Sequence, residues 1–134
     1  MIVADTNLVA SLYFETGGSE LAERVLRADS DWRAPFLWRS ELRNALSVLV
    51  RGERFSLGFA LEVIEAAERQ LRGCEYSIPS PAVLLLTDES RCSAYDCEFV
   101  ALANELGVPL VTLDREIIEA FPQVAISPQR FLEQ

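Results

Sequence analysis

Histidine and lysine are absent from this 134-residue chain, and all 12 of its basic residues are Arg. Without His, the Ser-His-Asp triad, Cys-His pairs and zinc sites built on H-E-x-x-H are excluded. Without Lys, Schiff-base chemistry and the phosphate-binding Lys of a Walker-type loop are excluded too. The side chains that remain for chemistry carry carboxylates, hydroxyls, thiols or guanidinium groups.

Cysteines are few, and long apolar runs are missing. Cys74, Cys92 and Cys97 are odd in number and form no C-x-x-C, so we expect small buried residues, not a disulfide framework or a zinc finger. No apolar run approaches the roughly 18 residues of a membrane span. The N-terminus, MIVADTN, lacks the basic segment of a secretory signal. We therefore expect a cytoplasmic protein without membrane association.

The net charge of −9 is unusual for a protein that binds nucleic acid, because such proteins usually present a basic surface. Two divalent cations bound by carboxylates would change this charge by +4, from −9 to −5. The acidic composition argues against tight non-specific binding to nucleic acid. Oxygen-rich acidic sites favour hard cations such as Mg²⁺ or Mn²⁺.

The pattern of apolar residues predicts an α/β fold. Half of the residues are apolar, and the length fits a single domain over residues 1–134. Expected strands cover 2–4, 32–35, 76–78, 109–113 and 124–126. Expected helices cover 6–14, 37–51, 56–72, 80–91, 93–106 and 114–121, and a polar tail follows. A further helix is expected after the N-cap Ser19, with Leu21, Val25 and Leu26 as its apolar stripe. This alternation predicts a short, mostly parallel central sheet with helices on both faces.

Four acidic residues lie directly after expected strands or near the starts of expected helices. Asp5 follows the first expected strand, and Asp114 follows the strand PLVTL. Ligands of open parallel sheets bind beyond the carboxyl ends of the strands, where both acids would lie. Glu41 and Asp96 lie near the starts of two expected helices. Crowded carboxylates repel one another unless cations compensate them, so convergence would indicate a metal site.

Each acid also has an ordinary structural explanation. Asp5 and Asp114 are favourable N-caps for the helices that follow them. Asp96 lies three residues after Ser93, close to a capping-box spacing, and Glu41 could be a helix residue favoured by the dipole. Because the chain has 21 acidic residues, only the combination of the four is informative.

Four segments resemble the motifs of the PIN-domain ribonucleases, most closely the VapC-type toxins of toxin–antitoxin pairs. They are D-T-N near the N-terminus, S-E-L about 35 residues on, Y-D-C-E-F-V-A-L-A, and L-V-T-L-D. The resemblance covers essentially the whole chain in order and spacing. It implies a PIN-like fold with Asp5, Glu41, Asp96 and Asp114 as catalytic, metal-binding residues.

The resemblance implies several further features. Thr6 and Thr112 match hydroxyls that support the acids, and Mg²⁺ or Mn²⁺ would be the cofactor. The partners would be an RNA substrate and a cognate antitoxin protein, and the chain would form a homodimer. Hydrolysis would leave a 5′-phosphate and a 3′-hydroxyl. Some relatives carry a further acid three residues after the fourth aspartate, where this chain has Ile117.

Basic and aromatic residues near the four acids are candidate RNA contacts. Arg39, Arg43, Arg91 and Arg115 could bind phosphates, although ordinary surface arginines are at least as common. Phe14, Trp38 and Tyr95 could stack on bases or pack in the core.

The sequence therefore predicts a metal-dependent endoribonuclease. One alternative is a phosphoacceptor signalling domain, which normally requires a lysine that this chain lacks. A haloacid-dehalogenase-type phosphotransferase needs D-x-D after the first strand, but Asn7 replaces the second acid. The third alternative is a catalytically silent PIN scaffold, against which the four acids argue.

Overall fold

The computed structural model describes all 134 residues, which form a five-stranded sheet and eight helices. The strands are β1 (Ile2–Ala4), β2 (Trp32–Pro35), β3 (Glu75–Tyr76), β4 (Leu110–Val111) and β5 (Ala125–Ile126). The helices are α1 (Thr6–Ser11), α2 (Ser19–Ala28), α3 (Leu37–Arg51), α4 (Leu57–Gln70), α5 (Ser80–Asp88), α6 (Ala94–Leu106), α7 (Arg115–Ala120) and α8 (Pro128–Leu132).

The sheet has the order β3-β2-β1-β4-β5, and every pair of neighbouring strands is parallel. The chain first builds outward from β1 to β2 and β3, then returns to the other side of β1 for β4 and β5. The order therefore reverses between β1 and β4, where an open α/β sheet forms a crevice at its carboxyl edge. The α/β prediction is confirmed, and the short sheet is entirely parallel.

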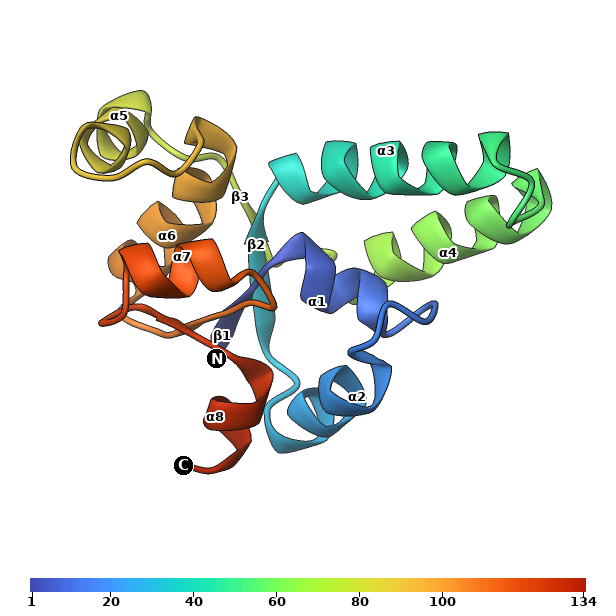
Figure 1. The fold of residues 1–134 in the computed structure, drawn as a ribbon, viewed down its shortest axis with the longest axis horizontal. Coiled ribbons are helices and arrows are strands. Elements are labelled where there is room, and N and C mark those ends of the chain that lie inside the picture. Colours follow the sequence, from blue (N-terminus) through green and yellow to red (C-terminus); the bar gives the residue numbers. More distant parts are fainter.

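Helices lie on both sides of the sheet, as the sequence predicts. In Figure 1, α1 and α2 lie on one side of β1 and β2, whereas α5, α6 and α7 lie on the other. Helices α3 and α4 pack against each other and extend away from the sheet as a two-helix arm. No helix is long and apolar enough to cross a membrane.

The core explains why α6 holds its position. All three residues of β1 are fully buried, as expected for a strand covered on both faces. Helix α6 packs on β1, β2 and β4, and it buries Phe99, Val100 and Leu102. Burying one such large apolar side chain contributes about 1.5–3 kcal/mol, so α6 and the acid in its first turn are held firmly against the sheet.

Helix ends follow mostly from local chemistry. The hydroxyl of Ser56 accepts the N–H of Phe59, and the hydroxyl of Ser93 accepts the N–H of Asp96. Gly107 ends α6 with φ 66°, a left-handed conformation that glycine adopts without strain. Asp114 is the N-cap of α7, as its sequence position predicts.

Some local expectations were wrong. Gly18, not Ser19, is the N-cap of α2, because the Ser19 hydroxyl donates to the carbonyl of Phe14. The expected polar tail contains α8, which begins at Pro128 after the N-cap Ser127 and packs on α2. The helix expected to reach Arg91 ends at Asp88, and several strands are shorter than predicted.

Candidate active site

Asp5 lies directly after β1 and is 7% exposed. Its Oδ1 accepts the backbone N–H of Thr6 at 2.8 Å, so Asp5 is the N-cap of α1. Its Oδ2 accepts the hydroxyl of Thr112 at 2.6 Å. Both oxygens of this buried carboxylate therefore have a fixed direction.

Thr112 joins the ends of the two central strands. It is fully buried just after β4, and its hydroxyl donates to Asp5. The same oxygen accepts the backbone N–H of Asp114 at 3.0 Å and the side-chain amide of Asn7 at 3.4 Å. One hydroxyl thus positions the first acid through its side chain and the fourth through its backbone.

Thr6 makes the corresponding link to α3. Its hydroxyl donates to Oε1 of Glu41 at 2.7 Å, while its backbone N–H binds Asp5. Glu41 is half-buried in the second turn of α3. A threonine on α1 therefore holds carboxylates that are 36 residues apart in the chain.

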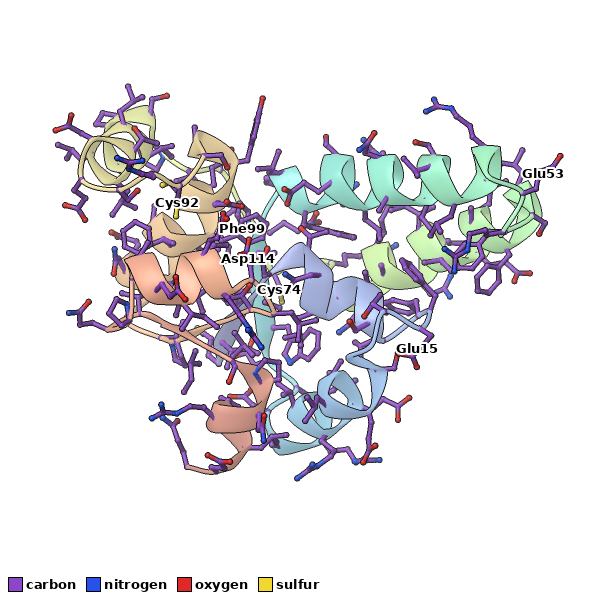
Figure 2. The ribbon with its side chains drawn as sticks, in the orientation of Figure 1. Glu15, Glu53, Cys74, Cys92, Phe99 and Asp114 are labelled. Carbon is purple, nitrogen blue, oxygen red and sulfur yellow. The ribbon has the colours of Figure 1, made fainter.

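The remaining two acids come from helix starts on the other side of the crevice. Asp96 lies in the first turn of α6, and Asp114 caps α7 by accepting the N–H of Glu116 at 2.9 Å. Asp114 appears near the middle of the molecule in Figure 2, whereas Glu15 and Glu53 project from its outer edge. The capping role that the sequence offered for Asp114 does occur, and it leaves Oδ2 available.

The acids affect one another electrostatically. Burial raises the pKa of Asp5 from 3.8 to about 7, against the lowering effect of its two hydrogen bonds, and the charges of Glu41 and Asp96 raise it further. Burial, and then the charge of Asp96, raises the pKa of Glu41. Burial and the charge of Asp114 raise the pKa of Asp96. The four carboxylates therefore share one electrostatic environment.

No group of three or more Cys, Asp or Glu side chains is arranged to hold a metal ion. The four acids lie close enough for their charges to act on one another, but their oxygens do not meet around a common point. None of them takes part in the five ion pairs of the chain. The site consequently has oxygen donors without an internal cation.

Sequence reasoning missed two further acids and one amide. The charge of Glu98 acts on Glu41, and the charge of Glu116 acts on Asp96. The crevice is therefore more acidic than a four-acid site. Asn7 accepts the N–H of Leu113 through Oδ1 at 3.2 Å and so ties α1 to the loop after β4. Only the D-T-N motif could have indicated Asn7, and no spacing signal singled out Glu98.

The candidate arginines do not form a basic rim. Three nitrogens of Arg39 donate to Glu68 and Glu75, which favours a structural role over contact with phosphate. Arg43 is exposed on the arm, where it lines a groove between α3 and α4. Arg91 and Arg115 are exposed on the side of α6 and α7, and nothing in the structure tests their contact with RNA.

The candidate aromatics differ in exposure. Trp38 is fully buried, and its indole N–H donates to Glu75, so base stacking is excluded for this residue. Phe14 packs edge-on against Phe55, with ring centroids 5.3 Å apart. Tyr95 is 63% exposed and keeps a free face. The three cysteines are free, but only Cys97 is buried as expected, whereas Cys74 and Cys92 are partly exposed.

The fold and the position of the four acids define a PIN-like domain, and two solved structures share this fold. The structure of PAE2754 from Pyrobaculum aerophilum aligns with a TM-score of 0.78 at 20% identity, covering 98% of this chain and 93% of that chain. The structure of FitAcB from Neisseria gonorrhoeae aligns with a TM-score of 0.74 at 18% identity, covering 96% and 99%. At such identities these likenesses establish the fold.

A protein that is related in sequence extends the similarity beyond the fold. Ribonuclease VapC3 of Pyrobaculum aerophilum is 28% identical over 127 residues, covering 90% of this chain and 95% of that protein. No protein-family model matches the sequence. The resemblance to VapC-type PIN-domain ribonucleases, first indicated by the four motifs, is confirmed over nearly the full chain.

The raised pKa of Asp5 predicts a specific pH dependence of stability. Between about pH 4 and about pH 7 the folded protein retains a proton that the unfolded chain has released. The free energy of unfolding should therefore fall as pH rises through this range, since each pKa unit corresponds to about 1.4 kcal/mol. In chelator, Asp5→Asn should raise Tm at pH 8 by several degrees and flatten the Tm–pH profile.

The control is Glu105→Gln, which changes an exposed acid on α6. Its Tm–pH profile should parallel that of the unaltered chain. Equal slopes for Asp5→Asn and the control would contradict the assigned environment of Asp5.

Proposed function

We propose that this chain is a metal-dependent endoribonuclease that hydrolyses RNA phosphodiesters to 5′-phosphate and 3′-hydroxyl ends. The observation that carries the proposal is the convergence of Asp5, Glu41, Asp96 and Asp114 on one crevice of a PIN-like fold. The name of the relative, Ribonuclease VapC3, supports the same activity. A catalytically silent scaffold would not need four carboxylates without a cationic partner.

The chemistry of the donors fits Mg²⁺ or Mn²⁺. All four side chains offer oxygen, burial and the charges of neighbouring acids raise the pKa values of three of them, and Asp5 is held by two hydrogen bonds. A bound cation of this kind would activate water and neutralise charge on the phosphate. Because no three acids reach a common point, binding would require side-chain rotation.

The chain's own groups would orient the reaction. Thr112 and Thr6 would keep Asp5 and Glu41 directed into the crevice, because each hydroxyl donates to a carboxylate. The chain has no His or Lys to serve as a conventional general base. A phosphoacceptor signalling domain remains the weaker alternative, since its switch normally uses a lysine.

Cleavage of single-stranded RNA should depend on Mg²⁺ or Mn²⁺. We expect EDTA to abolish it and Ca²⁺ not to restore it, because the larger Ca²⁺ prefers six to eight ligands in a looser geometry. Mn²⁺ should also raise Tm at pH 8 by relieving repulsion between the acids, whether or not RNA is cleaved. Full activity in chelator would contradict the metal mechanism.

Replacing each of the four acids by its isosteric amide should distinguish a catalytic role from a helix-capping role. Asp5→Asn, Glu41→Gln, Asp96→Asn and Asp114→Asn should each lower kcat/KM at least about 100-fold, while the fold is retained. Asn is itself a good N-cap, so a purely structural role for Asp5 or Asp114 predicts little change. Glu105→Gln is the matched control on α6. Retained activity with collapsed Tm values would favour the structural role.

We also propose an antitoxin partner and a homodimer in the cytoplasm, on the basis of the resemblance. An acidic site would be neutralised well by Arg from an inhibitor, whose planar guanidinium can bridge two carboxylates. The exposed Leu85 of α5 provides apolar surface for a second copy.

Expression of this chain alone should arrest growth, and co-expression with the adjacent gene should relieve the arrest and yield a salt-sensitive complex. Light scattering would give the stoichiometry. A chain that is harmless alone and binds nothing encoded beside it would contradict the toxin role, even if RNA cleavage is observed.

A further inference from the structure

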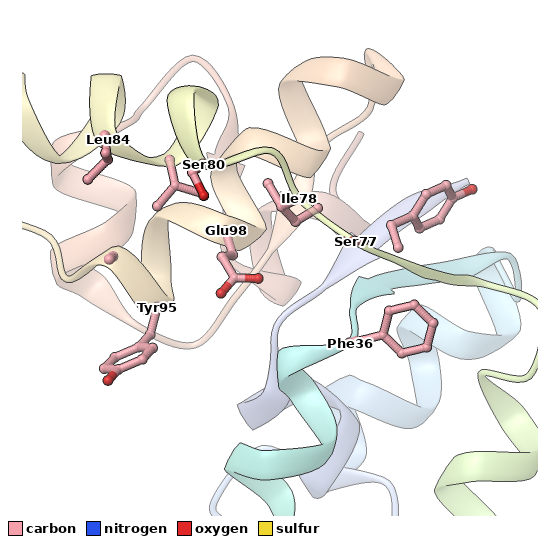
Figure 3. Close-up of a pocket in the computed structure, with 10 residues that line it drawn as sticks. Phe36, Ser77, Ile78, Ser80, Leu84, Tyr95 and Glu98 are labelled. Atoms are coloured by element: carbon pink, nitrogen blue, oxygen red, sulfur yellow. The ribbon is translucent and has the colours of Figure 1, made fainter.

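A pocket of about 380 Å³ lies beside the acid crevice. Its wall includes Phe36 at the end of β2, Ile78 before α5, Leu84 of α5, and Tyr95 and Glu98 of α6 (Figure 3). Pockets that bind small organic groups typically have volumes of about 300–1,000 Å³ and are mostly apolar with a few polar groups. This pocket has that composition, since seven of its 10 lining residues are hydrophobic.

The pocket adjoins the proposed catalytic acids. Tyr95 and Glu98 flank Asp96 in the first turns of α6, and the charge of Glu98 acts on Glu41. A group bound in the pocket would therefore lie next to a substrate held by these acids. No arginine lines the pocket, so a phosphate would find no positive charge there.

Aromatic side chains border the pocket. Tyr95 is 63% exposed and Phe36 is 51% exposed, although both rings belong to residue types that are usually more buried. Exposed aromatics beside a catalytic crevice are the common means of stacking on bases of single-stranded RNA.

Glu98 supplies the polar recognition group. It is half-buried and belongs to none of the chain's ion pairs. Its carboxylate projects from α6 into the space between Tyr95 and Phe36 (Figure 3). An ionised carboxylate offers two acceptor oxygens side by side and no donor.

We infer that this pocket binds a guanine base of the RNA substrate next to the cleaved bond, with Glu98 accepting from its N1–H and 2-amino groups. Guanine presents two neighbouring donors on its Watson–Crick edge. Adenine and cytosine each present one amino group beside a ring nitrogen that is an acceptor, and uracil presents one N–H between two carbonyls. A carboxylate therefore matches guanine alone. The inference rests on the proposed ribonuclease function and adds its base preference.

Substrate and side-chain changes together test this pairing. Single-stranded RNAs would carry guanine, inosine, adenine, cytosine or uracil at each position flanking the cleaved bond. Inosine lacks only the 2-amino group of guanine. At one of these positions, we expect kcat/KM for guanine to exceed kcat/KM for inosine by about tenfold. Inosine would lose the hydrogen bond from the 2-amino group, which is one half of the bidentate contact with Glu98.

Glu98→Gln should bring the guanine-to-inosine ratio close to one, because the Gln amide would place a donor against the 2-amino donor. Glu105→Gln on the same helix is the control and should keep the ratio. Tyr95→Ala should raise KM and Tyr95→Phe should restore it, since stacking needs the ring and not the hydroxyl. An unchanged ratio in Glu98→Gln would overturn the inference while leaving the ribonuclease function intact.

A binding measurement separates the two proposals. Guanosine, which carries no phosphate, should shift the NMR resonances of Tyr95 and Glu98 more than inosine or adenosine does, even in a chain that fails to cleave RNA. Equal shifts from all nucleosides would overturn the inference. The solvent protection of Phe36 and Tyr95 should also be measured at several protein concentrations and with the antitoxin. Protection that increases with protein concentration, or that appears only with the antitoxin, would assign the pocket to a protein partner. Either result would overturn the inference.

Discussion

Repulsion between carboxylates is the interaction on which the organisation of this protein depends. Burial first, and then the charges of neighbouring acids, raise the pKa values of Asp5, Glu41 and Asp96, and none of the three is paired with an arginine. Such an arrangement opposes folding, so the rest of the structure must compensate for it. The compensation comes from the buried sheet, the apolar face of α6, and two threonine hydroxyls that donate to the acids.

The parallel sheet makes this crowding geometrically possible. Because the strand order reverses between β1 and β4, the loops after these strands separate toward opposite faces and leave a crevice between them. Helix starts on either side then bring acids from α3 and α6 to the same edge. A purely antiparallel sheet would place the ends of alternate strands at opposite edges and could not gather these four positions in the same way.

Features set by short stretches of sequence were predictable. Asp5 and Asp114 could be placed at strand ends because apolar strands and Asp caps are local signals, and Gly107 marks the end of α6 for the same reason. Features set by distant contacts were not. The ion pairs of Arg39 depend on α4 and β3, and the hydrogen bond of the Trp38 indole depends on Glu75 of β3. The proximity of Glu98 to Glu41 depends on how α6 crosses the sheet, which no spacing rule contains.

The pairing of Arg39 with Glu68 and Glu75 has a mechanical consequence. These contacts fasten the start of α3 to both α4 and the sheet, only two residues before Glu41. The two-helix arm is therefore attached to the sheet beside Glu41, one of the four acids. A small rotation of the arm at this point would move Glu41 relative to the hydroxyl of Thr6, which donates a hydrogen bond to it. The guanidinium group of Arg39 thus links the placement of the arm to the placement of a carboxylate at the edge of the sheet.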